Sequence, residues 1–340
     1  MKFNFEATGV GSVPFANAKE ACRIIFDNFQ SIPFWPQLSK RSFLENMYAQ
    51  FSEKIPGLVI DEKNKNIYVD TSDIASRIEE VYEKYLEGDL DFFALSENYA
   101  RGFYEFLECL KAPQSKNIKF VKGQVIGPIS YALFLTDQNK KAIIYDKDIF
   151  EVLTKILVMK ARWQIKKLKK YFPNTIIFID EPYLVSIGSS FVNINIEAAF
   201  ERFDELVKAI KGEGSLVGAH CCGNTDFGLL LKRDIDILNF DAYNFTKEFA
   251  LYSGDIKNYL KDGKAIAWGM IPSSDAIEKE NKRTLADRFR SNLGLLANKG
   301  IDTKNISSLI TPSCGVGTLN EDTAKKVIEA ARTLSADLQI

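Results

Sequence analysis

One histidine and two cysteines are the residues with the clearest capacity for chemistry. His220 is the only histidine in the chain, and Cys222 follows it by two positions at the end of a β-rich run. Side chains alternate in direction along a strand, so we expect these two on one side and Cys221 on the other. Cys314 offers a third ligand from a distant part of the chain, and Asp241 a fourth through oxygen. Nitrogen and sulfur ligands of this kind predict a zinc (Zn²⁺) site.

The distribution of these ligands bears on what the zinc would do. Structural zinc sites usually take paired ligands from short loops, whereas His220 and Cys314 come from separate strands, which favours a catalytic site. A catalytic zinc ion can lower the pKa of a bound thiol, so that a thiolate nucleophile exists at neutral pH. The alternative is a buried histidine bonded to a backbone carbonyl beside two inert thiols. The position of the ligands at strand ends favours zinc.

The segments that would position these ligands are short β-rich runs, separated by longer charged segments of helical period. This alternation predicts βα units around a parallel sheet. About eight such runs are present, which is the number that closes a barrel, so we expect an α/β fold of the (β/α)8 or TIM barrel type. Catalytic groups then collect where the strands end. The runs are residues 7–11, 31–34, 118–123, 175–180, 215–221, 237–241, 265–268 and 307–311.

Length and composition fit one large domain that spans residues 1–340. One α/β barrel can fill a chain of 340 residues, and hydrophobic residues at 46% supply a sizeable core. Residues 57–70 predict a β-hairpin with an Asn-Lys-Asn turn, inserted into an early βα connection.

Charge and hydropathy exclude several classes of partner. Lysine and arginine total 44 against 45 acidic residues, which leaves no net charge to attract nucleic acid or an anionic membrane. The amino-terminal segment lacks the apolar stretch of a signal peptide, and no run approaches the roughly 20 apolar residues that span a bilayer. We therefore expect a cytoplasmic protein. Its five cysteines favour metal binding over a disulfide framework, with Cys22 and Cys109 as core residues.

Several segments, in order and over nearly the whole chain, resemble a known family. They are GVGS at 9–12, VKGQVIGP at 121–128, FIDEP at 178–182, HCC at 220–222 and TPSCG at 311–315. They are similar to the catalytic, carboxyl-terminal barrel of cobalamin-independent methionine synthase, and more closely to its short "core" relatives. That family belongs with uroporphyrinogen decarboxylase and the corrinoid methyltransferases. The resemblance implies a methyltransferase that forms methionine from homocysteine.

The resemblance also implies roles for individual residues. The zinc ligands would be His220, Cys222, Cys314 and Asp241, where Asp241 stands in place of the usual glutamate and is one methylene shorter.

The same resemblance implies how the acceptor is held. Gly11 and Ser12 would bind the carboxylate of homocysteine, and Asp180 would bind its ammonium group. From the sequence alone, Asp180 could equally be a strand-end residue bonded to backbone.

Three positions depart from the family pattern. A proton-donating histidine falls at Met270, a pterin-contacting glutamate at Ser186, and a tryptophan at Phe134. Demethylation of methyltetrahydrofolate expels a basic nitrogen that needs a general acid, whereas a methylcorrinoid expels Co(I), which needs no proton. We therefore predict that the methyl donor is methylcobalamin or another methylcorrinoid, carried by a separate corrinoid protein.

A corrinoid donor needs a wide mouth at the barrel. Candidates for its rim are Trp35, Arg41 and the hairpin at residues 57–70. The simpler interpretations are that Trp35 is a hydrophobic anchor and Arg41 a surface cation.

Other functions stay open. A related barrel family transfers methyl groups from corrinoid proteins to coenzyme M through a similar zinc site, but a sulfonate needs cations, and Asp180 favours an amino acid. Uroporphyrinogen decarboxylase uses no metal, so the intact ligand set argues against its activity. A zinc-stabilised barrel without catalytic activity would keep the metal and fill the barrel mouth with bulky residues.

Overall fold

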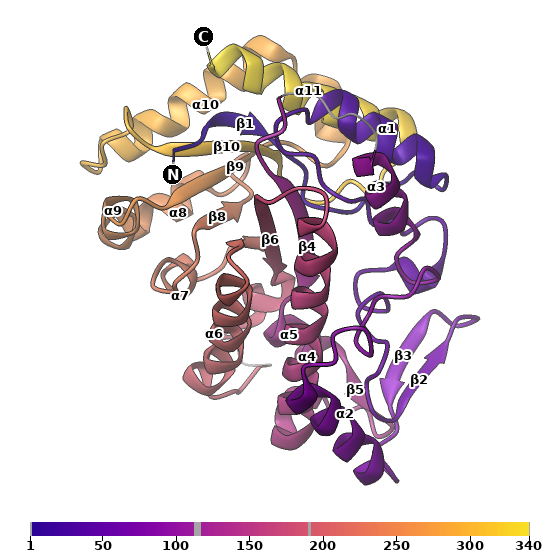
Figure 1. The fold of residues 1–340 in the computed structure, drawn as a ribbon. Coiled ribbons are helices and arrows are strands. Elements are labelled where there is room, and N and C mark those ends of the chain that lie inside the picture. Colours follow the sequence, from indigo (N-terminus) through magenta and orange to yellow (C-terminus); the bar gives the residue numbers. More distant parts are fainter. Residues whose placement is uncertain (1, 112–116, 190–191, 340) are drawn as a thin grey trace.

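A parallel sheet of seven strands is the centre of the molecule (Figure 1). The computed structural model describes residues 2–111, 117–189 and 192–339. The strands follow the order β1-β10-β9-β8-β7-β6-β4, and every pair is parallel. They are β1 (Asn4–Ala7), β4 (Val121–Ile126), β6 (Thr175–Asp180), β7 (Leu216–Cys221), β8 (Ile237–Phe240), β9 (Ala265–Ile271) and β10 (Ser307–Pro312).

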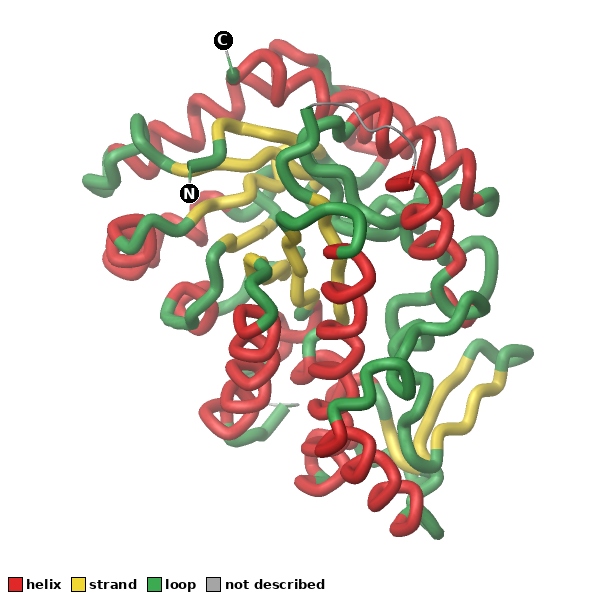
Figure 2. The backbone as a smooth tube through the Cα atoms, in the orientation of Figure 1, coloured by secondary structure: helices red, strands yellow, loops and turns green. Residues whose placement is uncertain are grey.

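Helices cover the outside of the curled sheet (Figures 1 and 2). The longer ones begin at side-chain caps, as at Asp146, Asn195 and Asn320, which accept a hydrogen bond from the first helical turn. No helix in the described ranges could cross a membrane. The helices are α1 (Ala18–Asn28), α2 (Ala75–Glu87), α3 (Arg101–Lys111), α4 (Pro128–Phe134), α5 (Lys147–Lys169), α6 (Ile196–Gly212), α7 (Phe227–Leu231), α8 (Thr246–Phe249), α9 (Ser253–Lys261), α10 (Lys282–Ala297) and α11 (Glu321–Leu338).

Side chains of the strands alternate between two cores. In β6, Ile177 and Ile179 belong to the large cluster that the helices share, whereas Ile176 and Phe178 belong to a smaller cluster. The smaller cluster contains alternate residues of several strands and no helical residue, so it fills the concave face of the sheet. Because both faces are covered, the strands are near-continuous apolar runs, which made them visible in the sequence.

The sheet curls like a β/α barrel, but strand pairing does not close it. The expected strand at 31–34 is wrong: this segment makes only an isolated bridge, from Phe34 to Lys122, and Gln37 beyond it makes another to Ser12. Pro33 and Pro36 explain this difference, since proline has no backbone N–H to donate to a ladder.

The first strand is also displaced from its predicted place. We expected residues 7–11, but β1 ends at Ala7. The chain then passes close to Phe34, whose ring fills the space that a Cβ atom at Gly9 would need. Residues 8–11 therefore form an irregular connection that leads to Ser12.

The predicted hairpin is confirmed. Strands β2 (Leu58–Asp61) and β3 (Asn66–Val69) pair antiparallel, and the short β5 (Thr136–Asp137) adds to β3. Lys65 in the turn has a φ of 52°, as a tight hairpin turn requires. This small sheet lies apart from the main sheet, at the lower right of Figure 1.

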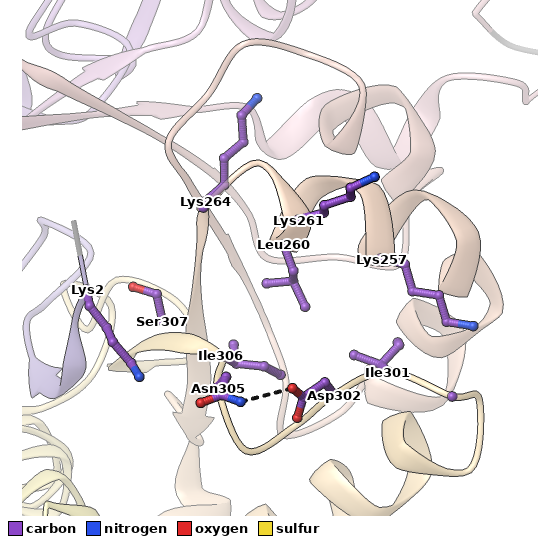
Figure 3. Close-up of a pocket in the computed structure, with 12 residues that line it drawn as sticks. Lys2, Lys257, Leu260, Lys261, Lys264, Ile301, Asp302, Asn305, Ile306 and Ser307 are labelled. Atoms are coloured by element: carbon purple, nitrogen blue, oxygen red, sulfur yellow. Dashed lines mark hydrogen bonds between the residues drawn. The ribbon is translucent and has the colours of Figure 1, made fainter.

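A cavity of about 510 Å³ lies at the amino-terminal ends of β9 and β10 (Figure 3). Leu260 and Ile301 point toward its centre, whereas the surrounding lysines, among them Lys257 and Lys261, point away from one another. This cavity is at the opposite ends of the strands from the predicted ligands. It therefore has no part in the site described next.

Candidate metal centre and acceptor site

His220, Cys222 and Cys314 meet where β7 and β10 end. One ring nitrogen and the two Sγ atoms all lie within 4.8 Å of one another. His220 is inside β7 and Cys222 directly follows the strand, while Cys314 comes two residues after β10. Cys221 is buried among the helix-facing residues, as the alternation predicts. The structure thus brings together three of the four residues that we expected to hold zinc.

The hydrogen bonds of the histidine ring decide whether it can bind a metal. Nδ1 of His220 lies 2.6 Å from Oδ1 of Asn239. The amide of Asn239 donates through Nδ2 to the Ala267 carbonyl and to Oγ1 of Thr311, both at 2.8 Å, so its oxygen must face the ring. In the neutral ring Nδ1 therefore carries the proton, and Nε2 keeps its lone pair.

This Nε2 atom is the best evidence that a metal fits. It is buried, and among the described residues no nitrogen or oxygen atom pairs with it, while the Cys222 sulfur interacts with the ring. A histidine ligand typically donates its other ring N–H to a neighbouring oxygen, as His220 does to Asn239. An unpartnered imidazole nitrogen beside two sulfur atoms is a donor set that zinc prefers.

The three groups of the candidate centre differ in how their surroundings shift their pKa values. A hydrogen bond from the Cys314 thiol is the largest of the effects that lower the pKa of Cys222 to about 4, against the opposing effect of burial. The same hydrogen bond raises the pKa of Cys314 well above its usual value. Burial acts to lower the pKa of His220, but the nearby Cys222 outweighs it and the pKa is raised. The lowered pKa of Cys222 favours its thiolate, the form of cysteine that binds metals.

Asp241 does not join this group. It follows β8 directly, but its carboxylate accepts hydrogen bonds from the backbone N and the Nδ2 of Asn244, at 2.9 and 2.7 Å. Burial raises its pKa, with smaller effects from Asn244, Cys222 and His220. A fourth ligand at Asp241 stays a prediction.

The loop of Cys314 is braced by a residue that sequence analysis missed. Oγ of Ser273 donates to the Cys314 carbonyl at 2.8 Å and accepts from the Cys314 N–H at 3.1 Å. The backbone N–H of Ser273 in turn donates to Oγ of Ser313. No pattern in the sequence connects position 273 with position 314, because the contact depends on how the two loops meet.

The predicted acceptor residue Ser12 lies against the same loop. Its carbonyl accepts from the N–H of Val316 at 2.9 Å, and its Oγ accepts from the N–H of Gly317 at 3.4 Å. A Cβ atom at Gly315 would collide with Oγ of Ser12, so glycine permits this close approach. Gly11 is held next to it by a hydrogen bond from the N–H of Gln37 to its carbonyl. Ser12, with Gly11 before it, therefore lies against the loop that carries Cys314.

Asp180 reaches the site from the neighbouring strand. It is the last residue of β6 and pairs in register with His220 of β7. Its Oδ1 is buried without a hydrogen-bond partner in the described part of the chain. Burial raises the pKa of Asp180 to about 6, against the lowering effects of His220 and Lys122. Asp180 is thus not simply a strand-end residue bonded to backbone, the other interpretation that the sequence allowed.

The three departures from the family pattern have different surroundings. Met270 lies within β9, and its sulfur contacts Nδ2 of Asn292 on α10, so it faces the helices and not the site. Ser186 ends a short 3-10 helix, Pro182–Ser186, and donates to the Tyr183 carbonyl. Met270 therefore does not stand where an acid could act.

Phe134 belongs to an aromatic cluster. Its ring stacks on Tyr48 with centroids 3.7 Å apart and planes 12° apart, and Tyr183 meets both rings edge-on. One face of Phe134 is therefore already covered by a side chain of this protein.

The rim candidates differ in outcome. Trp35 is fully buried and donates through Nε1 to Gln164, so it is a core residue and its place at the rim is wrong. Arg41 is partly exposed and forms an ion pair with the buried Glu45.

Comparisons with known proteins bear on the fold. Neither a family model nor a curated protein sequence matches this chain. A solved B12-independent methionine synthase from Shewanella sp. W3-18-1, in complex with selenomethionine, matches with a TM-score of 0.56 at 13% identity, over 98% of this chain and 97% of its own. A β-glucosidase mutant derived from a hyperthermophilic tetrameric structure reaches a TM-score of only 0.34. The likeness to the methionine synthase shows a common α/β fold over nearly the whole of both chains.

Proposed function

We propose that the protein is a zinc-dependent methyltransferase that forms methionine by methylating the thiolate of homocysteine, with a methylcorrinoid as donor. The observation that carries the proposal is the free, buried Nε2 of His220 beside the sulfur atoms of Cys222 and Cys314. The structural likeness to a methionine synthase supports the choice of reaction and acceptor.

The residues of the chain have separate tasks in this reaction. When bound, zinc would supply the acidity that keeps the acceptor thiol as a thiolate at neutral pH. Asn239 keeps the proton of His220 on Nδ1 and thereby leaves Nε2 free for the metal. Asp180 presents a buried carboxylate to the ammonium group of homocysteine, while Gly11 and Ser12 lie beside the Cys314 loop, where they can hold its carboxylate.

The choice of donor rests on what surrounds the site. His220 is the only histidine, so the chain has no second imidazole to protonate a folate leaving group. Phe134, where the family has a tryptophan, has one face covered by Tyr48. A methylcorrinoid needs no proton donor on departure. Free methylcobalamin or a methylated corrinoid protein is therefore the donor that these residues permit.

The test has two stages. Metal analysis of the purified protein is expected to find zinc bound in a stoichiometric amount. An assay with homocysteine is then expected to show methyl transfer from methylcobalamin and little from methyltetrahydrofolate. Equal turnover with methyltetrahydrofolate would refute the corrinoid donor, and faster methylation of coenzyme M than of homocysteine would refute the acceptor. Zinc without thiol alkylation by any donor would indicate a zinc-stabilised barrel.

A further inference from the structure

Two buried oxygen atoms near the site have no hydrogen-bond partner within the described ranges. They are Oε1 of Gln124 on β4 and Oδ1 of Asp180 on β6. The exposed fraction is 0% for Gln124 and 5% for Asp180. Buried polar atoms in folded proteins are nearly always paired, so two unpaired acceptors on neighbouring strands call for a ligand or ordered water.

Both side chains face the concave side of the sheet. Nζ of Lys122 lies 4.4 Å from the ring centroid of Phe178, a member of the concave cluster. Gln124 comes two residues after Lys122, and Asp180 two residues after Phe178, so alternation directs both to the same side. In the β4–β6 register Gln124 pairs with Phe178. Asp180 is two residues further along β6 and faces the same side.

The orientation of the Gln124 amide is fixed. Its Nε2 donates to the Trp35 carbonyl at 3.1 Å, so the atom left without a partner is the oxygen. The side chain also lies beside Gly11, where a Cβ atom would be only 3.0 Å from Cδ of Gln124. Gln124 is therefore next to Gly11, proposed to hold the acceptor's carboxylate, and its strand pairs with the strand that ends at Asp180, proposed to hold the ammonium group.

We propose that Oε1 of Gln124 and Oδ1 of Asp180 together accept hydrogen bonds from the ammonium group of the acceptor. An ammonium group has three donors and no acceptor, which matches two unpartnered oxygens. A sulfonate has only acceptor oxygens and would leave both atoms unpaired. Gln124 is thus a substrate-binding residue that selects amino-acid thiols. This inference rests on the proposed function.

Binding measurements without a methyl donor test the inference. The ligands are homocysteine and 4-sulfanylbutanoate, which lacks only the amino group, and titration calorimetry on the zinc-loaded protein gives both dissociation constants. We expect the wild-type protein to prefer homocysteine. Gln124→Met should reduce that preference by about tenfold to a hundredfold, because a hydrogen bond to a charged group is lost. Gln124→Glu also loses the hydrogen bond to the Trp35 carbonyl, but it keeps an oxygen that can accept from the ammonium group. It should therefore keep the preference for homocysteine.

Each contrary result has a distinct meaning. Equal affinity of the wild-type protein for the two thiols would overturn the inference, while the binding itself would support the proposed function. A loss of preference in Gln124→Glu as large as in Gln124→Met would assign the effect to the Trp35 hydrogen bond and also overturn it. If neither thiol binds the zinc-loaded protein, the proposed function fails and the inference fails with it.

Discussion

Asn239 of β8 holds the ring of His220 of β7 through a hydrogen bond of 2.6 Å between Oδ1 and Nδ1. The amide of Asn239 is itself held by Ala267 of β9 and Thr311 of β10. Four neighbouring strands thus cooperate to aim one imidazole nitrogen. The direction of the His220 ring is therefore set by the register of the sheet.

Removal of this support should weaken metal binding. We expect Asn239→Leu to bind zinc about tenfold to a hundredfold more weakly, since the His220 ring then loses its fixed orientation and tautomer. Competition with a chromophoric chelator measures this affinity, and thermal unfolding checks that the fold persists. Asn239→Asp, which keeps an oxygen toward Nδ1, should retain most of the affinity. An Asn239→Leu protein that binds zinc as tightly as the wild type would show that Asn239 does not support metal binding by His220.

Adjacent cysteines provide a matched test of the ligand set. Cys222→Ala should lose bound zinc and thiol alkylation together, because it removes a ligand atom from the cluster. Cys221→Ala should keep its zinc and lose about 1 kcal/mol of stability, since the Cys221 side chain packs in the helix-facing core. Metal content of the two purified variants decides the matter. Zinc retained in Cys222→Ala and lost in Cys221→Ala would reverse the assignment.

Glu181 should make the stability of the fold depend on pH. Its carboxyl accepts hydrogen bonds from the N–H groups of Ile129 and Ser130, and burial raises its pKa from 4.5 to about 7. Between these two values the folded chain keeps a proton that the unfolded chain has lost. The contribution of Glu181 to stability is therefore largest at low pH and declines as the pH rises through this window.

A neutral variant isolates this contribution. From pH 5 to pH 7.5, the free energy of unfolding of the wild type relative to Glu181→Gln should fall by on the order of 2 kcal/mol. Urea denaturation of both proteins at several pH values measures it. A wild type that gains stability relative to Glu181→Gln over the same range would show that Ile129 and Ser130 keep the carboxylate ionised.

Sequence patterns brought out the three candidate ligands because their positions follow from local rules. Alternation along a strand placed His220 and Cys222 on one side, and the position after a strand placed Cys314 at the same end of the sheet. The buried strands were found for a similar reason: β6, for instance, is a continuous buried run, Thr175–Asp180, with the predicted bounds.

Supporting residues could not be found in this way. The contacts of Asn239 and Ser273 depend on which residues face each other across strands and loops, and a single sequence does not contain that register. The eight-strand barrel went wrong because apolar residues around Pro33 suggested a strand, while the missing N–H of proline prevented the ladder.

The contact between the Ser12 and Cys314 loops has a thermodynamic consequence. Val316 and Gly317 donate to Ser12, so the loop that carries a proposed metal ligand and the loop proposed to hold the acceptor form one unit. Because the two loops are hydrogen-bonded to each other, a ligand that stabilises the position of one loop also stabilises the position of the other. Binding free energies coupled in this way are reciprocal, so metal and acceptor would tighten each other's binding by the same factor.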